Sequence, residues 1–208
     1  MKYIIYDFNG TILDDVDVGV KCLNYLVDKY HIREKAFSRD EYLDIFTFPV
    51  IDYYRNAGFT FEDVSFEIIG QEWIEKYQSL KDEYHLVEGI KDILEANLKK
   101  GYKNIILSAS KLDNLIAQCK ELGIYDYFED ILGIGDIYAG SKEYIAKEWI
   151  KDKDPSECIF IGDTIHDLEV AKAMNVRCAL VASGHQARYR LEAAHNEVYD
   201  NISGVKYD

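Results

Sequence analysis

The stretch that decides the fold is Met1-Lys2-Tyr3-Ile4-Ile5-Tyr6-Asp7-Phe8-Asn9-Gly10-Thr11-Ile12-Leu13, at the start of the chain. A run of apolar and aromatic residues, from Tyr3 to Tyr6, leads directly into the carboxylate of Asp7 and then into a Gly-Thr turn. Apolar character without alternation is typical of a strand that is buried on both faces. The stretch therefore predicts a buried strand over residues 2–7 with Asp7 at its carboxyl end.

Further short runs rich in Ile and Val alternate with longer amphipathic stretches along the rest of the chain. The runs predict strands over Asn104–Ala109, Asp130–Gly133, Cys158–Gly162 and Cys178–Val181. The amphipathic stretches predict helices over Gly89–Lys100, Leu112–Leu122, Lys142–Lys151 and Asp167–Met174. Strands that alternate with helices indicate an α/β fold, in which a parallel sheet has helices on both faces.

Residues 15–86 break this rhythm, because their pattern is helical throughout and contains no convincing strand. Aromatic residues recur there at helical spacing, and we expect them to pack in a core: Tyr42, Phe46, Tyr53, Tyr54, Phe66, Trp73 and Tyr77. The pattern predicts an α-helical insertion after the first strand. We therefore expect a core domain formed by residues 1–14 and 87–208, and a helical cap domain formed by residues 15–86.

Composition excludes several classes of function. A chain of 208 residues with 48% hydrophobic content can bury a core, and a net charge of −14 disfavours binding to a nucleic-acid backbone. The sequence has no signal-peptide pattern and no apolar run long enough to cross a bilayer, so we expect no membrane partner. The cysteines lack C-x-x-C spacing, which favours reduced thiols and a cytoplasmic protein: Cys22, Cys119, Cys158 and Cys178.

Polar side chains stand at the ends of three predicted strands. Asp7 ends the first strand, Ser108 ends the second, and Asp163 follows the fourth directly. In an open parallel sheet the ligand site lies beyond the carboxyl ends of the strands, so we expect these groups at one rim. Each residue alone could instead form a turn or cap a helix. Two carboxylates at one rim repel each other unless a cation lies between them, and hard oxygen ligands suit Mg²⁺, which favours a phosphate-bearing substrate.

Four short motifs, in this order and at these intervals, resemble those of the haloacid dehalogenase-like phosphohydrolases. They are Asp7-Phe8-Asn9-Gly10-Thr11-Ile12, Ile105-Ile106-Leu107-Ser108, Lys142 within Gly140-Ser141-Lys142-Glu143-Tyr144-Ile145, and Gly162-Asp163-Thr164-Ile165-His166-Asp167. The resemblance implies a Rossmann-like core with a helical cap inserted after the first motif. Among subgroups, the chain is most similar to the phosphoglycolate phosphatase and phosphoglucomutase branch.

The resemblance also implies roles for the motif residues. Asp7 would be the nucleophile that forms an aspartyl-phosphate, with Mg²⁺ bound by Asp7, Asp163 and the backbone carbonyl of Asn9. Lys142 would supply positive charge to the phosphate from the start of a helix. A lysine there is disfavoured by the helix macrodipole, so we expect a specific role for it. Asp167 would bind the metal through water or hold Lys142. The remaining expected phosphate ligands are the Ser108 hydroxyl, the Ala109 N–H group, Gly10 and Thr11.

Asn9 departs from the family pattern, because phosphatases of the family have an acid/base Asp at this position. Asn has the same backbone carbonyl and a side chain of the same size, but it cannot transfer a proton, a function typically worth about 10²–10⁴ in rate. A native enzyme tolerates this loss if its substrate has a good leaving group, such as an acyl or aryl phosphate; an engineered Asn that traps a complex is the other interpretation. His166 is a candidate substitute proton carrier, and a solvated loop histidine is the other interpretation. We expect His185 to be a solvated loop residue, and Asp14, Asp15 and Asp17 to lie on the surface.

The sequence thus predicts a Mg²⁺-dependent phosphatase that hydrolyses a small phosphate monoester or acyl phosphate of a metabolite. The alternative is a phosphate-binding regulatory or interaction protein that has the fold and the metal site but has lost turnover through Asn9. Dehalogenase chemistry is disfavoured, because it needs no metal whereas Asp163 and Asp167 preserve the metal-type motif.

Overall fold

The structure is a computed structural model that describes residues 1–135 and 141–207, so Gly140 of the third motif lies outside it. Its centre is a six-stranded sheet of order β5-β4-β1-β6-β7-β8, in which all neighbouring strands are parallel. The strands are β1 (Tyr3–Tyr6), β4 (Lys103–Lys111), β5 (Phe128–Ile134), β6 (Cys158–Gly162), β7 (Arg177–Val181) and β8 (Val198–Tyr199). The predicted parallel α/β fold is confirmed.

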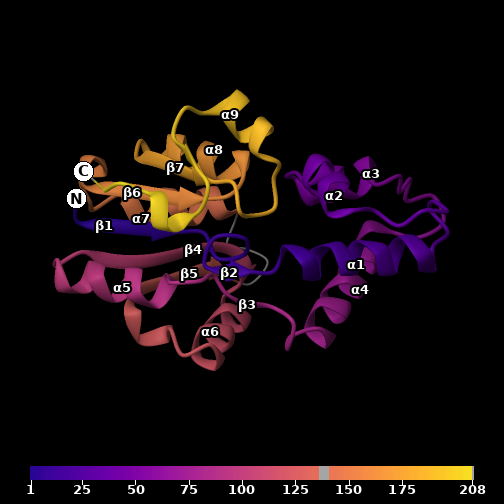
Figure 1. Cartoon of the computed structure of the whole chain (residues 1–208), viewed down its shortest axis with the longest axis horizontal. Helices are drawn as coiled ribbons and strands as arrows, with labels where there is room; N and C mark the ends of the chain where they lie inside the picture. Colours follow the sequence, from indigo (N-terminus) through magenta and orange to yellow (C-terminus); the bar gives the residue numbers. More distant parts are fainter. Residues whose placement is uncertain (136–140, 208) are drawn as a thin grey trace.

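Helices cover both faces of the sheet (Figure 1). One face packs against α5 (Ile90–Lys99) and α6 (Leu112–Glu121), and the other packs against α7 (Lys142–Ile150), α8 (Ile165–Met174) and α9 (Arg188–Ala194). Short 3₁₀ helices complete the core: η1 (Tyr125–Tyr127), η2 (Pro155–Glu157) and η3 (Ile202–Gly204).

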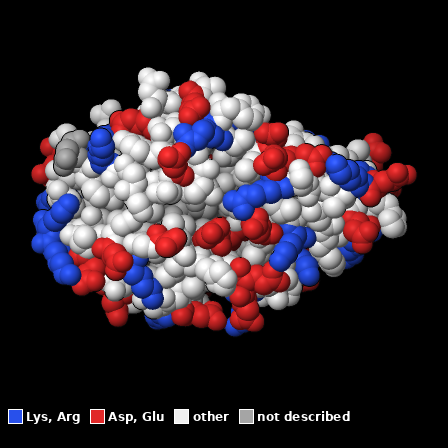
Figure 2. Space-filling view, viewed as in Figure 1, with Lys and Arg blue, Asp and Glu red and all other residues white. Residues whose placement is uncertain are grey.

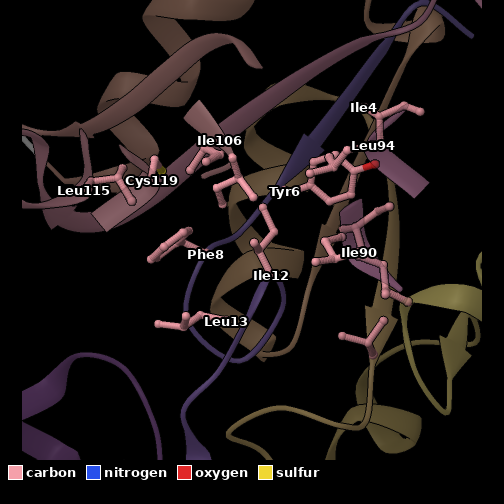
Figure 3. Packing of buried hydrophobic residues seen from close by; sticks show 14 of the residues in the cluster. Ile4, Tyr6, Phe8, Ile12, Leu13, Ile90, Leu94, Ile106, Leu115 and Cys119 are labelled. Carbon is pink, nitrogen blue, oxygen red and sulfur yellow. The ribbon is translucent and has the colours of Figure 1, made fainter. Parts of the chain in front are cut away.

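Strand β1 shows why its sequence is apolar without alternation. Ile4 and Tyr6 belong to the buried cluster on one face of the sheet, where Figure 3 shows them near Ile90 and Leu94 of α5. Ile5 belongs to the cluster on the opposite face. Both faces of β1 are therefore buried, and the strand lies between β4 and β6 at the middle of the sheet.

The four helices α1 to α4 form a separate group, which we call the helical segment. They are α1 (Val16–Lys29), α2 (Arg39–Ile45), α3 (Val50–Asn56) and α4 (Phe66–Ser79), and they share a buried cluster of their own. Figure 1 shows the segment beyond the end of the sheet toward which β1 runs. The connection to the core is an antiparallel pair of two-residue strands, β2 (Leu13–Asp14) and β3 (His85–Leu86).

Several element boundaries differ from the prediction. Strand β3 lies within residues 15–86, where no strand was expected, because two residues are too few to give a period. Strand β4 continues to Lys111, so Ser108 lies inside the strand rather than at its end; its pairing with β5 shifts register between Leu107 and Lys111. Helix α8 begins at Ile165, since Thr164 is its N-cap and Asp167 completes the capping box.

The surface and the cysteines are consistent with the composition. On the face in Figure 2, Lys and Arg side chains are interspersed with Asp and Glu. Within the described ranges, every helix is too short or too polar to cross a membrane. All four cysteines are buried and free.

Candidate active site

Three carboxylates meet at the carboxyl end of the sheet. Asp7 follows β1, Asp163 follows β6, and Asp167 lies in the first turn of α8. Each offers an oxygen that lies within 4.8 Å of the others, which makes the group a candidate metal site. Pairing of Tyr6 with Ile161 across the sheet places Asp7 and Asp163 side by side, as the sequence predicted.

Lys142 is buried against two of these acids. Its Nζ donates a hydrogen bond to Asp7 Oδ1 and another, of 2.6 Å, to Asp167 Oδ1. The other oxygen of Asp167 accepts from the Thr164 backbone N–H at 2.9 Å and from the Thr164 hydroxyl at 2.7 Å. Of the two roles expected for Asp167, these contacts support the one in which it holds Lys142. Lys142 is the first residue of α7, and the two carboxylates are the reason for a lysine at that position.

Burial dominates the electrostatics of the acids. It raises the pKa of Asp7 to about 6, although Lys142 opposes the shift, and raises the pKa of Asp163 to about 8, with Asp7 and Asp167 adding to it and His185 opposing it. For Asp167, Lys142 and Thr164 outweigh burial and lower the pKa. Two buried carboxyls with raised pKa values in one group are what a divalent cation stabilises in the ionised form. Asp7 and Asp163 therefore fit Mg²⁺, which prefers carboxylate oxygens.

The expected phosphate ligands occupy two environments. Ser108 is buried, and its hydroxyl accepts a hydrogen bond from the Ser110 N–H at 3.1 Å, whereas Ala109 between them is exposed. Thr11 and Gly10 make contacts within the protein, because the Thr11 hydroxyl donates to Asp163 Oδ1 at 3.2 Å and the Gly10 N–H donates to Leu13 O at 2.8 Å. Gly10 has φ of +73°, and a Cβ there would lie 2.3 Å from Asp163 Oδ2, so only glycine fits.

The side-chain amide of Asn9 contacts Asp15, a residue that was expected on the surface. Its Nδ2 donates to Asp15 Oδ2 at 2.7 Å and to the Tyr77 hydroxyl at 3.0 Å, while its Oδ1 accepts from the Ser110 hydroxyl at 3.3 Å. Asp15 was expected on the surface, and this is wrong: its exposed fraction is only 2%. The reason is that hydrogen-bond donors surround its carboxylate inside the molecule. Asp14 and Asp17 are exposed, as expected.

His185 was expected to be solvated, and this is also wrong. The residue is buried, with Nε2 3.0 Å from Asp15 Oδ1, Nδ1 2.8 Å from the Tyr42 hydroxyl, and its backbone N–H donating to Asp163 Oδ2 at 2.6 Å. Burial opposes its charge, but Asp15 outweighs burial and raises the pKa of His185 to about 9. The available signal was its position, since it follows β7 and β7 lies beside β6 in the sheet.

His166 lies in the first turn of α8 rather than in a loop. Its ring stacks on Phe48 of the helical segment, with centroids 4.7 Å apart, and its Nδ1 lies 3.6 Å from Glu169. These contacts place it against the helical segment, and none of them joins it to Asp7 or Asn9.

Comparison with known proteins indicates the same family as the sequence motifs. Residues 4–181 match the family model of the haloacid dehalogenase-like hydrolases. A pyrophosphatase, PpaX, of Bacillus velezensis is 24% identical over 98% of this chain and 96% of its own length. A phosphoglycolate phosphatase of Vibrio vulnificus is 33% identical, over 46% of this chain and 42% of its own length.

Solved structures match over nearly the whole chain. A haloacid dehalogenase-like hydrolase from Bacteroides fragilis superposes with a TM-score of 0.80 at 19% identity, covering 97% of each chain. CbbY from Rhodobacter sphaeroides, solved in complex with phosphate, gives a TM-score of 0.74 at 20% identity, covering 98% of this chain and 96% of its own. At these identities the matches establish the fold.

Proposed function

The chain belongs to the haloacid dehalogenase-like hydrolase family, and from that premise we propose that it is a Mg²⁺-dependent phosphatase for small phosphorylated metabolites with good leaving groups. Phosphoanhydrides, acyl phosphates and aryl phosphates are the candidate classes. The full-length similarity to a pyrophosphatase supports the first of them. The four free, buried cysteines agree with our proposal of a cytoplasmic location.

The observation on which the proposal depends is the buried arrangement of Asp7, Lys142 and Asp163. Asp7 is a carboxylate at the end of the central strand, with a lysine held against it by Asp167. A carboxylate nucleophile that attacks an anionic phosphate needs positive charge close to it. Lys142 supplies one such charge, and Mg²⁺ bound by Asp7, Asp163 and the Asn9 carbonyl would supply the rest by polarising the phosphoryl oxygens.

The first step is attack by an Asp7 carboxylate oxygen on phosphorus. A new bond between that oxygen and phosphorus forms, the bond from phosphorus to the leaving oxygen breaks, and the leaving group departs with the electron pair. Lys142 keeps the Asp7 carboxylate oriented and stabilises the charge on the transferred group. The Ser108 hydroxyl and the exposed Ala109 lie on the neighbouring strand β4, where they can bind phosphate oxygens.

Asn9 limits which leaving groups can depart. An alkoxide must be protonated as it leaves, and an amide cannot supply the proton. Phosphate, carboxylate and phenolate leave without that help. In the second step, water attacks phosphorus and regenerates Asp7; this step also lacks a carboxylate base at position 9, so we expect turnover to be slow and aspartyl-phosphate to accumulate.

The test is a panel of substrates with matched chemistry. Pyrophosphate, acetyl phosphate and p-nitrophenyl phosphate should release phosphate in the presence of Mg²⁺, whereas 2-phosphoglycolate and glucose 6-phosphate should react far more slowly. Asp7→Asn is the control and should abolish all release. The phosphatase proposal fails if the panel gives no Mg²⁺-dependent release; if Mg²⁺ with vanadate still raises the melting temperature, the alternative of a phosphate-binding regulatory protein is supported instead.

A further inference from the structure

Asp15 is a buried acid that the proposed reaction does not yet use. We propose that Asp15 and Asn9 form a matched carboxylate–amide pair, in which Asp15 is a positioning residue that fixes the Asn9 side chain and the Gly10 turn for phosphoryl transfer. This inference rests on the proposed function, because positioning has a meaning only for a site that reacts.

The first observation is that the Asp15 carboxylate accepts hydrogen bonds from four donors. Oδ1 accepts from the Gly10 N–H at 2.9 Å and lies 3.0 Å from His185 Nε2. Oδ2 accepts from Asn9 Nδ2 at 2.7 Å and from the Tyr77 hydroxyl at 2.7 Å. A buried carboxylate with both oxygens saturated is held rigidly and so holds its donors rigidly. Two of those donors belong to the motif that contains Asp7.

The second observation explains the amide at position 9. An Asp side chain there would place a carboxylate oxygen 2.7 Å from Asp15 Oδ2, where Asn9 now places a donor. Two carboxylates at that distance repel each other unless one of them keeps its proton, and the Tyr77 hydroxyl, which already donates to Asp15, has no second proton to give. Asn9 therefore complements Asp15, and an Asp at position 9 would repel Asp15 or hold a proton against it, so it would not act as an ordinary acid/base residue.

The third observation ties this pair to the helical segment. Tyr77 belongs to α4, and His185 is held from its other side by Tyr42 of α2 at 2.8 Å. A Cβ on Gly19 of α1 would lie 2.5 Å from the Tyr42 hydroxyl, so glycine at this position permits the close approach. Asp15 therefore has all four donors only when α4 is seated on the core, and α2 holds one of them, His185, through Tyr42. Asp15 thus makes the position of Asn9 depend on that seating.

The test is a double-mutant cycle of Asn9→Asp, Asp15→Asn and the swapped pair Asn9→Asp/Asp15→Asn. Melting temperature, kcat and KM are measured on acetyl phosphate and on 2-phosphoglycolate. Asn97→Asp is the matched control, because Asn97 is a buried asparagine whose Nδ2 also donates to a tyrosine hydroxyl and to a side-chain oxygen, those of Tyr6 at 2.7 Å and Asn104 at 3.1 Å. It lies on α5, and both of these hydrogen bonds go to residues outside the site.

Each single variant should lower the melting temperature, and Asp15→Asn should lower kcat on acetyl phosphate by about 10–100-fold while KM stays unchanged. The swapped pair restores a donor facing an acceptor, so it should regain melting temperature and should exceed Asn9→Asp in kcat on 2-phosphoglycolate. Asn97→Asp should lower the melting temperature alone, and adding Asp15→Asn should not rescue it.

Additive effects in the cycle, or an Asn9→Asp variant as stable as the wild type, would overturn the inference while leaving the phosphatase proposal intact. A wild type that is inactive on the whole substrate panel, pyrophosphate and p-nitrophenyl phosphate included, would instead defeat the proposed function. In that case the melting temperatures, with and without Mg²⁺, still decide the pairing: the Mg²⁺-induced rise should be smaller in Asp15→Asn than in Asn97→Asp if Asp15 positions the Asn9 carbonyl.

Discussion

At the scale of single residues, the motif residues and their supporting residues were not equally predictable. Asp7, Asp163 and Lys142 could be recognised because each follows a strand or begins a helix in a spaced motif. Asp15 and His185 could not, because a position just before a helix or just after a strand does not show whether the side chain points inward. That direction depends on tertiary partners, namely Tyr77 and Tyr42.

Lys142 offers a sharp test at this scale. Lys142→Ala leaves Asp7 and Asp167 buried without their cation, so we expect a loss of about 3–5 kcal/mol in the free energy of unfolding and loss of activity. Urea denaturation at pH 7 without Mg²⁺ measures the first effect. Lys147→Ala in the same helix is the control, because Lys147 pairs with Glu143 on the surface and should change neither quantity. A Lys142→Ala variant as stable as this control would contradict the assigned ion pairs.

The pKa values of Asp7 and Asp163 predict how Mg²⁺ binding depends on pH. Both are raised in the metal-free protein, to about 6 and about 8, so protons compete with the cation more strongly as pH falls. The pKa values of Asp7 and Asp163 are higher in the folded than in the unfolded protein. Protonation of these two acids therefore contributes to metal-free stability fully below about pH 4, and that contribution is lost as pH rises to about 8. Mg²⁺ should restore it, so the Mg²⁺-induced rise in melting temperature should be small at pH 5 and large at pH 8.

Asp163→Asn is the control for this titration. The variant has one fewer carboxylate to deprotonate, so its Mg²⁺-induced rise should be smaller and should vary less between pH 5 and pH 8. A rise that is independent of pH in the wild type would argue against Asp7 and Asp163 as the binding groups.

At the scale of elements, periodicity predicted the type of most strands and helices, and packing decided their ends. The apolar run of β1 was informative because both faces of the strand are buried. Strands β2, β3 and β8, of two residues each, were missed because so short a strand has no period. Ser108 was predicted at a strand end because a polar residue after an apolar run is typical of one. In the structure β4 continues past Ser108, and its pairing with β5 shifts register there.

The joints of the helical segment give a prediction at this scale. The chain crosses between the core and the segment at the short pair β2 and β3, and Asp14 and His85 in it are exposed. Limited proteolysis should therefore cut first near Asp14 and near Val87–Gly89, and Mg²⁺ with vanadate should slow the cuts if the segment closes over the site.

Arg190→Ala is the informative variant for this experiment. Arg190 Nη1 donates to the carbonyl oxygens of Leu43, Asp44 and Phe46 at 3.1, 2.9 and 2.7 Å, and so fastens the end of α2 to α9. Its removal should speed the cuts at both joints. Uniform cleavage along the chain, or rates that neither ligand nor Arg190→Ala changes, would show that the helical segment is not a separate unit.

At the scale of the whole molecule, the fold brings distant parts of the chain to one rim. Residues 7, 142, 163 and 185 meet only because β1, β6 and β7 are neighbours in the sheet and α7 begins beside them. The family motifs made this convergence predictable. The contribution of the helical segment to the rim, through Tyr42 and Tyr77, became visible only in three dimensions.

The proposed role of Asp7 as the nucleophile of a phosphatase can be tested by intact mass spectrometry after acid quenching. The protein is mixed with acetyl phosphate and Mg²⁺, quenched within seconds, and compared with Asp7→Asn treated in the same way. We predict a phosphate adduct in the wild type that maps to Asp7, because Asn9 leaves the second step without its base, and no adduct or phosphate release in Asp7→Asn. Phosphate release that continues in Asp7→Asn, or an adduct on another residue, would contradict the account.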